Sequence, residues 1–283
     1  MEQLLYLGSL AIRFRSEAAF PLQQWDAKFL TPVLPVTAQA YADLTFTDRL
    51  SIPEGHPHEV RGMKIWNTDD GEYRLYHAPK EVGPYLLSHR QDNTVHILAR
   101  RDGWGHDYQS FRPWFHIHVE ELLLQNRALV LHSASIIYRG QAIAFTAPSG
   151  TGKTTQTDLW HQYRSDVADL NGDRTLLQWT PDGWYGCGFP VFGSTVRCEQ
   201  AAAPLGAIVI VRQSPTDRVR ELTMMEKVTL LYSEITVPAM SQETIGQAMD
   251  LIETLAAQVK VLQLDCTMNE SAVDVLHRYL FGE

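Results

Sequence analysis

The stretch FTAPSGTGKTT, at residues 145–155, combines residue types that hold the phosphates of a nucleotide. Gly150 and Gly152 let backbone N–H groups come close to phosphate oxygens, because glycine has no side chain and adopts unusual dihedral angles. Lys153 would supply positive charge to the β and γ phosphates, and the hydroxyl of Thr154 would ligate Mg²⁺. The stretch therefore predicts binding of ATP, or of another nucleoside triphosphate, together with Mg²⁺.

The segments on either side of this loop support the prediction. The apolar run QAIAFTA, at 141–147, is typical of a strand, and GKTTQTDLWHQYR, at 152–164, is typical of a helix. A helix N-terminus offers unpaired N–H groups and the positive end of the helix dipole to an anion. The predicted nucleotide-binding residues are Ser149, Gly150, Thr151, Gly152, Lys153, Thr154 and Thr155.

One position departs from the usual pattern: Ala147 stands where such loops open with glycine. Alanine is the smallest replacement and is tolerated where the backbone angle φ is negative. Pro148 favours an extended backbone in the residue before it. Two alternatives to a working phosphate loop stay open, namely a chance glycine turn at a helix start and a degenerate loop that no longer binds.

The elements that must position the loop belong to residues 116–283, where strand and helix patterns alternate and predict an α/β domain. A helix is expected within 114–127, and a hairpin is expected at 128–147 around Arg139-Gly140. Further elements are short strands within 167–189, strands at 205–213 and 259–266, helices at about 223–235 and 241–258, and a last helix at 269–281 that Asn269 would cap.

Residues 1–115 have a different pattern, which predicts a smaller β-rich (α+β) domain. The first 17 residues, MEQLLYLGSLAIRFRSE, indicate a pair of strands and lack the basic start of a secretion signal. Turn residues between alternating runs predict hairpins at 63–78 and 84–100. Residues 20–36 are expected to form an irregular connection. Residues 101–114 are expected to form a surface linker to the second domain or, alternatively, to lie over the active site. Substrate recognition is the role we expect for this first domain.

Composition excludes some classes of function. The formal net charge of −9 and the pI of about 5.6 argue against nucleic-acid binding, which needs a basic face. No apolar run reaches the roughly 18 residues of a membrane helix, so no membrane partner is expected. Cys187, Cys198 and Cys266 form no CxxC motif, and the sequence is that of a cytoplasmic protein with reduced thiols.

A histidine and an aspartate extend the loop into a larger pattern, H…APSGTGKT…GD. It resembles the C-terminal catalytic domain of HPr kinase/phosphorylase, a bacterial protein-serine kinase. In that family a histidine precedes the loop's first position by fifteen residues, as His132 precedes Ala147 here. An Asp pair follows the loop, and this chain has Gly172-Asp173 at that place. The resemblance covers about residues 128–215, and SGTGKTT also resembles the loop of phosphoenolpyruvate carboxykinases.

The resemblance implies an α/β P-loop kinase domain of HPr kinase type. It implies an ATP- and Mg²⁺-dependent phosphotransferase that acts on a hydroxyl, most simply a Ser or Thr of a small protein or of a ribosomal precursor peptide. Catalytic roles fall on Asp173, His132 and Lys153, and the metal ligands are Thr154 and Asp173. Asp173 is either a metal ligand or the base that takes the hydroxyl proton. The family also forms closed oligomers, which makes a homo-oligomer one implied state.

Several departures from the HPr kinase pattern restrict the reactions that we expect. Gly172 replaces the first Asp of the pair, and Thr155 stands where HPr kinase has an acidic residue. The arginine-rich signature that the family uses for phosphorolysis is missing, so phosphorylation is expected rather than its reverse. Carboxykinases are much longer and have further metal ligands, which disfavours decarboxylation. A small-molecule kinase and a non-catalytic nucleotide-binding regulatory module remain the alternatives.

Other residues carry weaker signals. Arg174 and Arg197 could contact a phosphate, or be surface charges. The segment 189–195, FPVFGST, could be an acceptor or nucleotide loop, although a tight turn fits it better. A metal site could be built from His116, His118 and Glu120, but no fourth ligand is evident.

Overall fold

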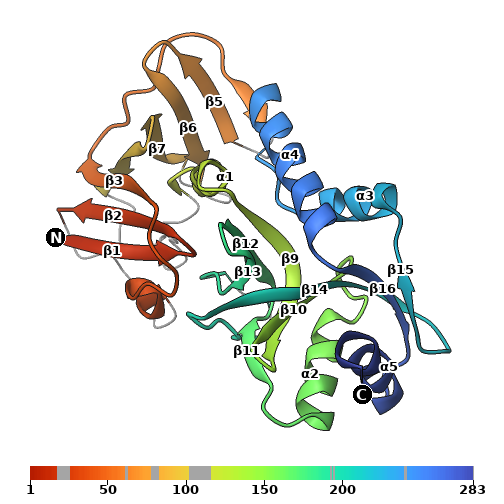
Figure 1. Cartoon of the computed structure of the whole chain (residues 1–283). Coiled ribbons are helices and arrows are strands. Elements are labelled where there is room, and N and C mark those ends of the chain that lie inside the picture. Colours follow the sequence, from red (N-terminus) through yellow and green to blue (C-terminus); the bar gives the residue numbers. More distant parts are fainter. Residues whose placement is uncertain are drawn as a thin grey trace. The chain divides into compact units, whose positions relative to one another are not determined.

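The computed structural model divides the chain into two units, Met1–Asn126 and Arg127–Glu283 (Figure 1). The residues that it describes are 1–17, 26–60, 63–77, 83–101, 116–191, 193, 195–238 and 241–282, with the backbone alone at Asp26. Within these ranges, no helix combines the length and the apolar character needed to cross a membrane.

The first unit is built on an eight-stranded sheet with the order β1-β2-β3-β8-β7-β6-β5-β4. Its neighbouring strands are antiparallel, except that β3 runs parallel to both β2 and β8. The expected N-terminal strand pair and both expected hairpins are confirmed. The strands are β1 Glu2–Leu7, β2 Leu10–Ser16, β3 Ala38–Thr47, β4 His58–Val60, β5 Met63–Thr68, β6 Gly71–His77, β7 Pro84–Gln91 and β8 Thr94–Arg100.

Helix α1, Val119–Gln125, also lies in the first unit and is shorter than the sequence pattern suggests. It starts after His118, whose left-handed backbone (φ 54°) cannot continue a helix. Glu121 forms an ion pair with the buried Arg74 of β6, and the Asn126 amide donates to Ser9 Oγ at 2.9 Å. These contacts place the boundary between the units at residues 126 and 127, eleven residues beyond the expected boundary of 115 and 116.

The expected irregular connection contains a 3₁₀ helix, Asp26–Leu30. Most of the expected linker, 102–114, and residues 18–25 lie outside the described residues.

The second unit contains the other sheet, with the order β10-β9-β12-β13-β14-β16-β15. Strand β11 pairs with β9, and β10 also pairs in parallel with β14, so the path from β10 through β9, β12 and β13 to β14 closes on itself. The strands are β9 Ala128–Tyr138, β10 Gln141–Thr146, β11 Ala168–Asn171, β12 Arg174–Thr180, β13 Gly183–Cys187, β14 Ala202–Gln213, β15 Arg218–Glu221 and β16 Val261–Cys266. The helices are α2 Lys153–Tyr163, α3 Met224–Glu234, α4 Gln242–Gln258 and α5 Glu270–Phe281.

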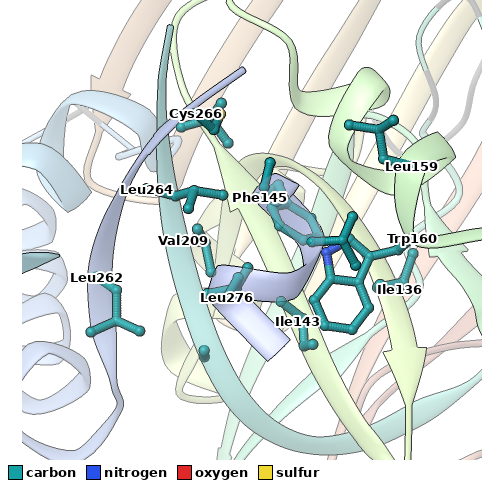
Figure 2. Packing of buried hydrophobic residues seen from close by; sticks show 14 of the residues in the cluster. Ile136, Ile143, Phe145, Leu159, Trp160, Val209, Leu262, Leu264, Cys266 and Leu276 are labelled. Atoms are coloured by element: carbon teal, nitrogen blue, oxygen red, sulfur yellow. The ribbon is translucent and has the colours of Figure 1, made fainter. Parts of the chain in front are cut away.

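The core of the second unit lies where α2 and α5 pack side by side against the sheet (Figure 2). Trp160 of α2 is fully buried among Phe145, Ile136 and Leu276. Burying one such side chain contributes about 1.5–3 kcal/mol of hydrophobic stabilisation. This packing holds the start of α2 against the end of β10, where the phosphate loop lies.

The helices predicted at 223–235 and 241–258 are confirmed as α3 and α4, and each begins with a capping box. The predicted strands and the last helix are confirmed as well. Asn269 occupies the N-cap position of α5, but its side chain makes no capping hydrogen bond, so that part of the prediction is wrong. The sequence pattern missed the short strand β15.

Candidate active site

The predicted phosphate loop lies between the end of β10 and the start of α2, as the sequence requires. Gly150 and Gly152 have positive φ values of 78° and 115°, which residues with side chains rarely adopt. Apart from the chain neighbours of each glycine, no atom of the described residues comes within 4 Å of the place where a Cβ would stand on either one, so the loop is open on that side. The first N–H groups of α2 have no partner within the helix, and such groups bind phosphate oxygens.

Ala147 fits the loop without strain, because its φ is not positive. The residue is 1% exposed and belongs to the core cluster around Trp160. Its methyl group therefore packs inside the second unit rather than in the space that a phosphate would enter.

Lys153 begins α2, and its ammonium group bends back onto the loop. Nζ donates to the carbonyl oxygens of Ala147 at 2.7 Å and of Pro148 at 3.4 Å. Burial lowers the pKa of Lys153 from the ordinary lysine value, while the negative charges of Glu234 and Asp173 oppose that shift. The loop and the lysine are thus in contact, and the lysine charge lies within reach of two carboxylates.

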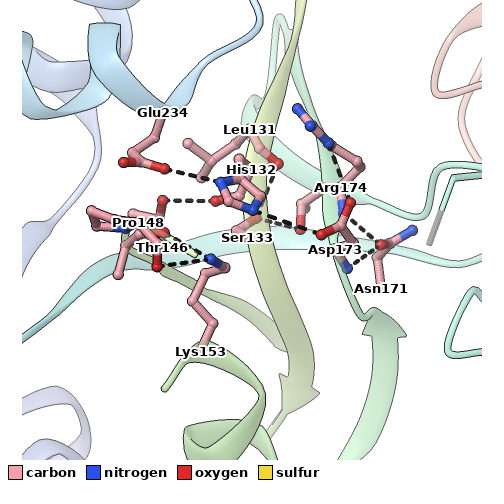
Figure 3. Close-up of polar contacts among 12 residues, drawn as sticks. Leu131, His132, Ser133, Thr146, Pro148, Lys153, Asn171, Asp173, Arg174 and Glu234 are labelled. Carbon is pink, nitrogen blue, oxygen red and sulfur yellow. Dashed lines mark hydrogen bonds and ion pairs between the residues drawn. The ribbon is translucent and has the colours of Figure 1, made fainter. Parts of the chain in front are cut away.

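His132 lies on β9 between these two carboxylates (Figure 3). Its Nδ1 is 3.1 Å from Glu234 Oε2, and its Nε2 is 3.7 Å from Asp173 Oδ1. The hydroxyl of Thr146, at the end of β10, donates to the His132 carbonyl oxygen at 2.8 Å. This bond ties the histidine to the strand that leads into the phosphate loop.

Asp173 stands in the turn between β11 and β12. The side-chain oxygen of Asn171 accepts the backbone N–H groups of Asp173 at 2.8 Å and of Arg174 at 2.7 Å, an arrangement that asparagine favours in tight turns. The carbonyl oxygen of Asp173 accepts the N–H of Ser133 at 3.0 Å. The turn is therefore fixed both internally and to β9, and it brings Asp173 beside His132.

Sequence reasoning missed Glu234. It is separated from His132 by 102 residues and comes from the end of a helix that carries no motif. The one local signal is an acidic residue in the last turn of α3, where the helix dipole disfavours negative charge.

The structure brings Lys153, His132 and Asp173 together, with Thr154 and Thr155 in the first turn of α2. Ser149 and Gly150 are exposed at the loop tip. Thr154 carries a hydroxyl and Asp173 a carboxylate, which are oxygen ligands of the type that Mg²⁺ uses together with substrate phosphates and water. Within the described ranges, no cluster of three or more His, Cys, Asp or Glu residues could hold a metal.

The weaker candidates have other partners. Arg197 pairs with Asp158 at 2.7 Å, and its Nε is 3.7 Å from Asp169. In the segment 189–195, Gly193 lies against Asp173, and Phe192 and Ser194 are outside the described residues.

The histidines that precede α1 are engaged within the first unit. His116 contacts the hydroxyl of Tyr85 at 2.8 Å, and His118 contacts Ser88 Oγ at 2.7 Å. Because the helix starts only at Val119, His116 and Glu120 do not share a helical face, which removes one basis for the metal-site alternative.

Comparison with known proteins adds no further constraint on this site. The sequence matches none of the protein-family models, and no similar curated protein is found.

Proposed function

We propose that this protein is an ATP- and Mg²⁺-dependent phosphotransferase of the HPr kinase type that phosphorylates a hydroxyl group. The observation that carries the proposal is the pair of His132 and Asp173, 3.7 Å apart, with the aspartate close enough for its charge to act on Lys153 of the phosphate loop. A module that only binds a nucleotide needs the loop and the lysine. It has no need for a histidine and a carboxylate at the same place.

Each residue has a role that its position supports. The loop N–H groups and Lys153 would bind the triphosphate, and Thr154 and Asp173 would hold Mg²⁺, which neutralises phosphate charge when bound. The acceptor oxygen forms a bond to the γ phosphorus as the bond to the β,γ-bridging oxygen breaks, and ADP leaves. The proton of the acceptor hydroxyl passes to Asp173 or to His132.

The acceptor that we propose is a Ser or Thr of a small protein or ribosomal precursor peptide, recognised by the first unit. We place the reaction in the cytoplasm. Supporting this, none of Cys187, Cys198 and Cys266 forms a disulfide.

The test is transfer of label from [γ-³²P]ATP, with Mg²⁺, to peptides encoded beside the gene and to a panel of small alcohols. Wild type and Lys153→Ala are compared, with Glu253→Gln, an exposed acid-to-amide change on α4, as the matched control. Label on a peptide serine or threonine in wild type and in the control, and none in Lys153→Ala, is the expected result. Label on a small alcohol alone would favour a small-molecule kinase. ATP binding without transfer to any acceptor would favour a regulatory module.

A further inference from the structure

The second carboxylate at His132 comes from a distant segment of the chain. Glu234, the last residue of α3, accepts a hydrogen bond from His132 Nδ1 at 3.1 Å, on the side of the ring away from Asp173. A carboxylate oxygen only accepts hydrogen bonds, so Nδ1 carries the proton in this contact. The Nε2 atom then lies on the side of Asp173, at 3.7 Å from Oδ1.

Backbone contacts fix where Glu234 stands. Ile235, the next residue, forms an antiparallel bridge with Leu131, the neighbour of His132 on β9. The N–H of Thr236 donates to the carbonyl oxygen of Val130 at 2.8 Å. The chain that leaves α3 is thus bound to the same strand that carries His132, so the contact between the two side chains does not depend on side-chain packing alone.

Helix stability does not account for an acid at this position. The C-terminal end of a helix carries partial negative charge, and a carboxylate there is disfavoured by about 0.3–1 kcal/mol. The last turn of α3 contains no basic residue, and Glu234 is only 14% exposed. His132, a residue of the candidate active site, compensates for the unfavourable placement of Glu234 at the helix end by donating a hydrogen bond to it.

The turn that carries Asp173 is crowded at Gly172, the position where the family has its first Asp. A Cβ on Gly172 would stand 2.6 Å from Thr195 Oγ1 and 3.3 Å from the Cβ of Arg197. The second carboxylate beside His132 comes instead from α3.

Building on the phosphotransferase proposed above, we propose that Glu234 is a positioning residue that acts through His132. It holds the imidazole by Nδ1 and so keeps Nε2 directed toward Asp173. Histidines that act in catalysis are commonly held in one tautomer by such a carboxylate. The charged groups around this histidine are Asp173, Arg174, Glu234 and Lys153.

The test uses wild type, Glu234→Gln, Glu234→Ala and the control Glu253→Gln. Long-range ¹H–¹⁵N spectra of histidine-labelled protein at one fixed pH report the tautomer, and His132→Gln assigns the signal. A fluorescent ATP analogue reports nucleotide binding. With the acceptor found by label transfer, we expect kcat to fall by about 10- to 100-fold in Glu234→Ala and by less in Glu234→Gln, whose amide oxygen can still accept a hydrogen bond from Nδ1. The KM for ATP should change less, and the control should show no change.

Loss of the Nδ1–H signature in Glu234→Ala, with nucleotide binding kept, supports the inference. The same tautomer in wild type and Glu234→Ala overturns it, whatever the activity. The spectra need no acceptor, so a failure of this inference can be distinguished from a failure of the proposed function. If the proposed function is wrong, wild type binds the analogue and phosphorylates nothing, while the spectra still decide whether Glu234 orients His132.

Discussion

Arg174 forms an ion pair with Asp173, with 3.3 Å between Nε and Oδ2, and its Nη1 atom donates to Thr236 Oγ1 at 2.9 Å. One side chain thus joins the turn that carries Asp173 to the segment that follows Glu234. The two carboxylates beside His132 are linked through this arginine as well as through β9. Arg174 is also a direct neighbour of Asp173, so it could reach a transferring phosphate.

Replacing Arg174 by Ala distinguishes a structural role, in which Arg174 holds the Asp173 turn, from a catalytic role, in which it contacts the transferring phosphate. The ion pair is about one-third exposed on both sides, and pairs of this kind contribute roughly 0.2–1 kcal/mol. An energy of about 1 kcal/mol corresponds to about a fivefold change in rate. If Arg174 only holds the turn in place, kcat should therefore fall by less than about fivefold. Steady-state phosphotransfer kinetics measure this. A loss above about 100-fold would show instead that Arg174 contacts the transferring phosphate.

Replacing Ala147 by Gly should leave nucleotide affinity unchanged, because the alanine methyl group packs into the core and the backbone there has no positive φ. Stability should fall by about 1 kcal/mol, since glycine increases the conformational freedom of the unfolded chain. Equilibrium denaturation and titration with a fluorescent ATP analogue measure the two effects. Clearly tighter nucleotide binding by the glycine variant would mean that Ala147 restricts the loop.

Gly172→Ala should destabilise the second unit by about 1–3 kcal/mol, the usual cost of overpacking. The added Cβ would stand 2.6 Å from Thr195 Oγ1. The matched control is Gly246→Ala on α4, where alanine should stabilise the helix by up to about 1 kcal/mol. Beyond the backbone of α4 itself, no atom in the described part of the chain lies within 4 Å of the new Cβ. Denaturation curves compare the two. Equal stability of Gly172→Ala and wild type would show that the 195–197 segment yields to a side chain.

The stability of the first unit should decrease on acidification because of His118. Burial lowers the pKa of this histidine to about 3, with the charge of Arg74 acting in the same direction and Glu72 opposing it. Between about pH 3 and 6.5 the unfolded chain binds a proton that the folded chain does not. The stabilising contribution of the neutral, buried His118 is therefore present above pH 6.5. It is lost as the pH falls, by at most about 1.4 kcal/mol per pH unit.

Denaturation of wild type, His118→Gln and the exposed control His56→Gln at pH 7 and pH 5 measures this effect. The difference in unfolding free energy between the two pH values should shrink in His118→Gln and stay as in wild type in the control. An unchanged difference in His118→Gln would assign the acid sensitivity to other groups.

Much of this architecture could be predicted from the sequence because its signals are local. The hairpin turns, the alternating strands and the strand–loop–helix around Lys153 each depend on residues close in the chain. Even the fifteen-residue spacing from His132 to Ala147 is the length of one hairpin. That His132 and Asp173 belong to one site is implied by the resemblance to HPr kinase, in which such a histidine and an aspartate flank the loop.

The rest depends on tertiary contacts that sequence spacing does not encode. Glu234 reaches His132 through the bridge between Ile235 and Leu131, which no local pattern indicates. The start of α1 is set by His118, whose buried contact with Ser88 outweighs the helical pattern before Val119. The Asp173 turn, by contrast, is local, because Asn171 accepts the N–H groups two and three residues further along the chain.

The most direct test of the central claim is a paired measurement of ATP binding and phosphotransfer in wild type, Asp173→Asn and His132→Ala. If these residues perform the chemistry beside the loop, both variants should bind the ATP analogue nearly as wild type does. Phosphotransfer should fall by about 100-fold or more in Asp173→Asn and by a smaller factor in His132→Ala. Undiminished phosphotransfer in Asp173→Asn, or a wild-type protein that binds no ATP, would contradict the account.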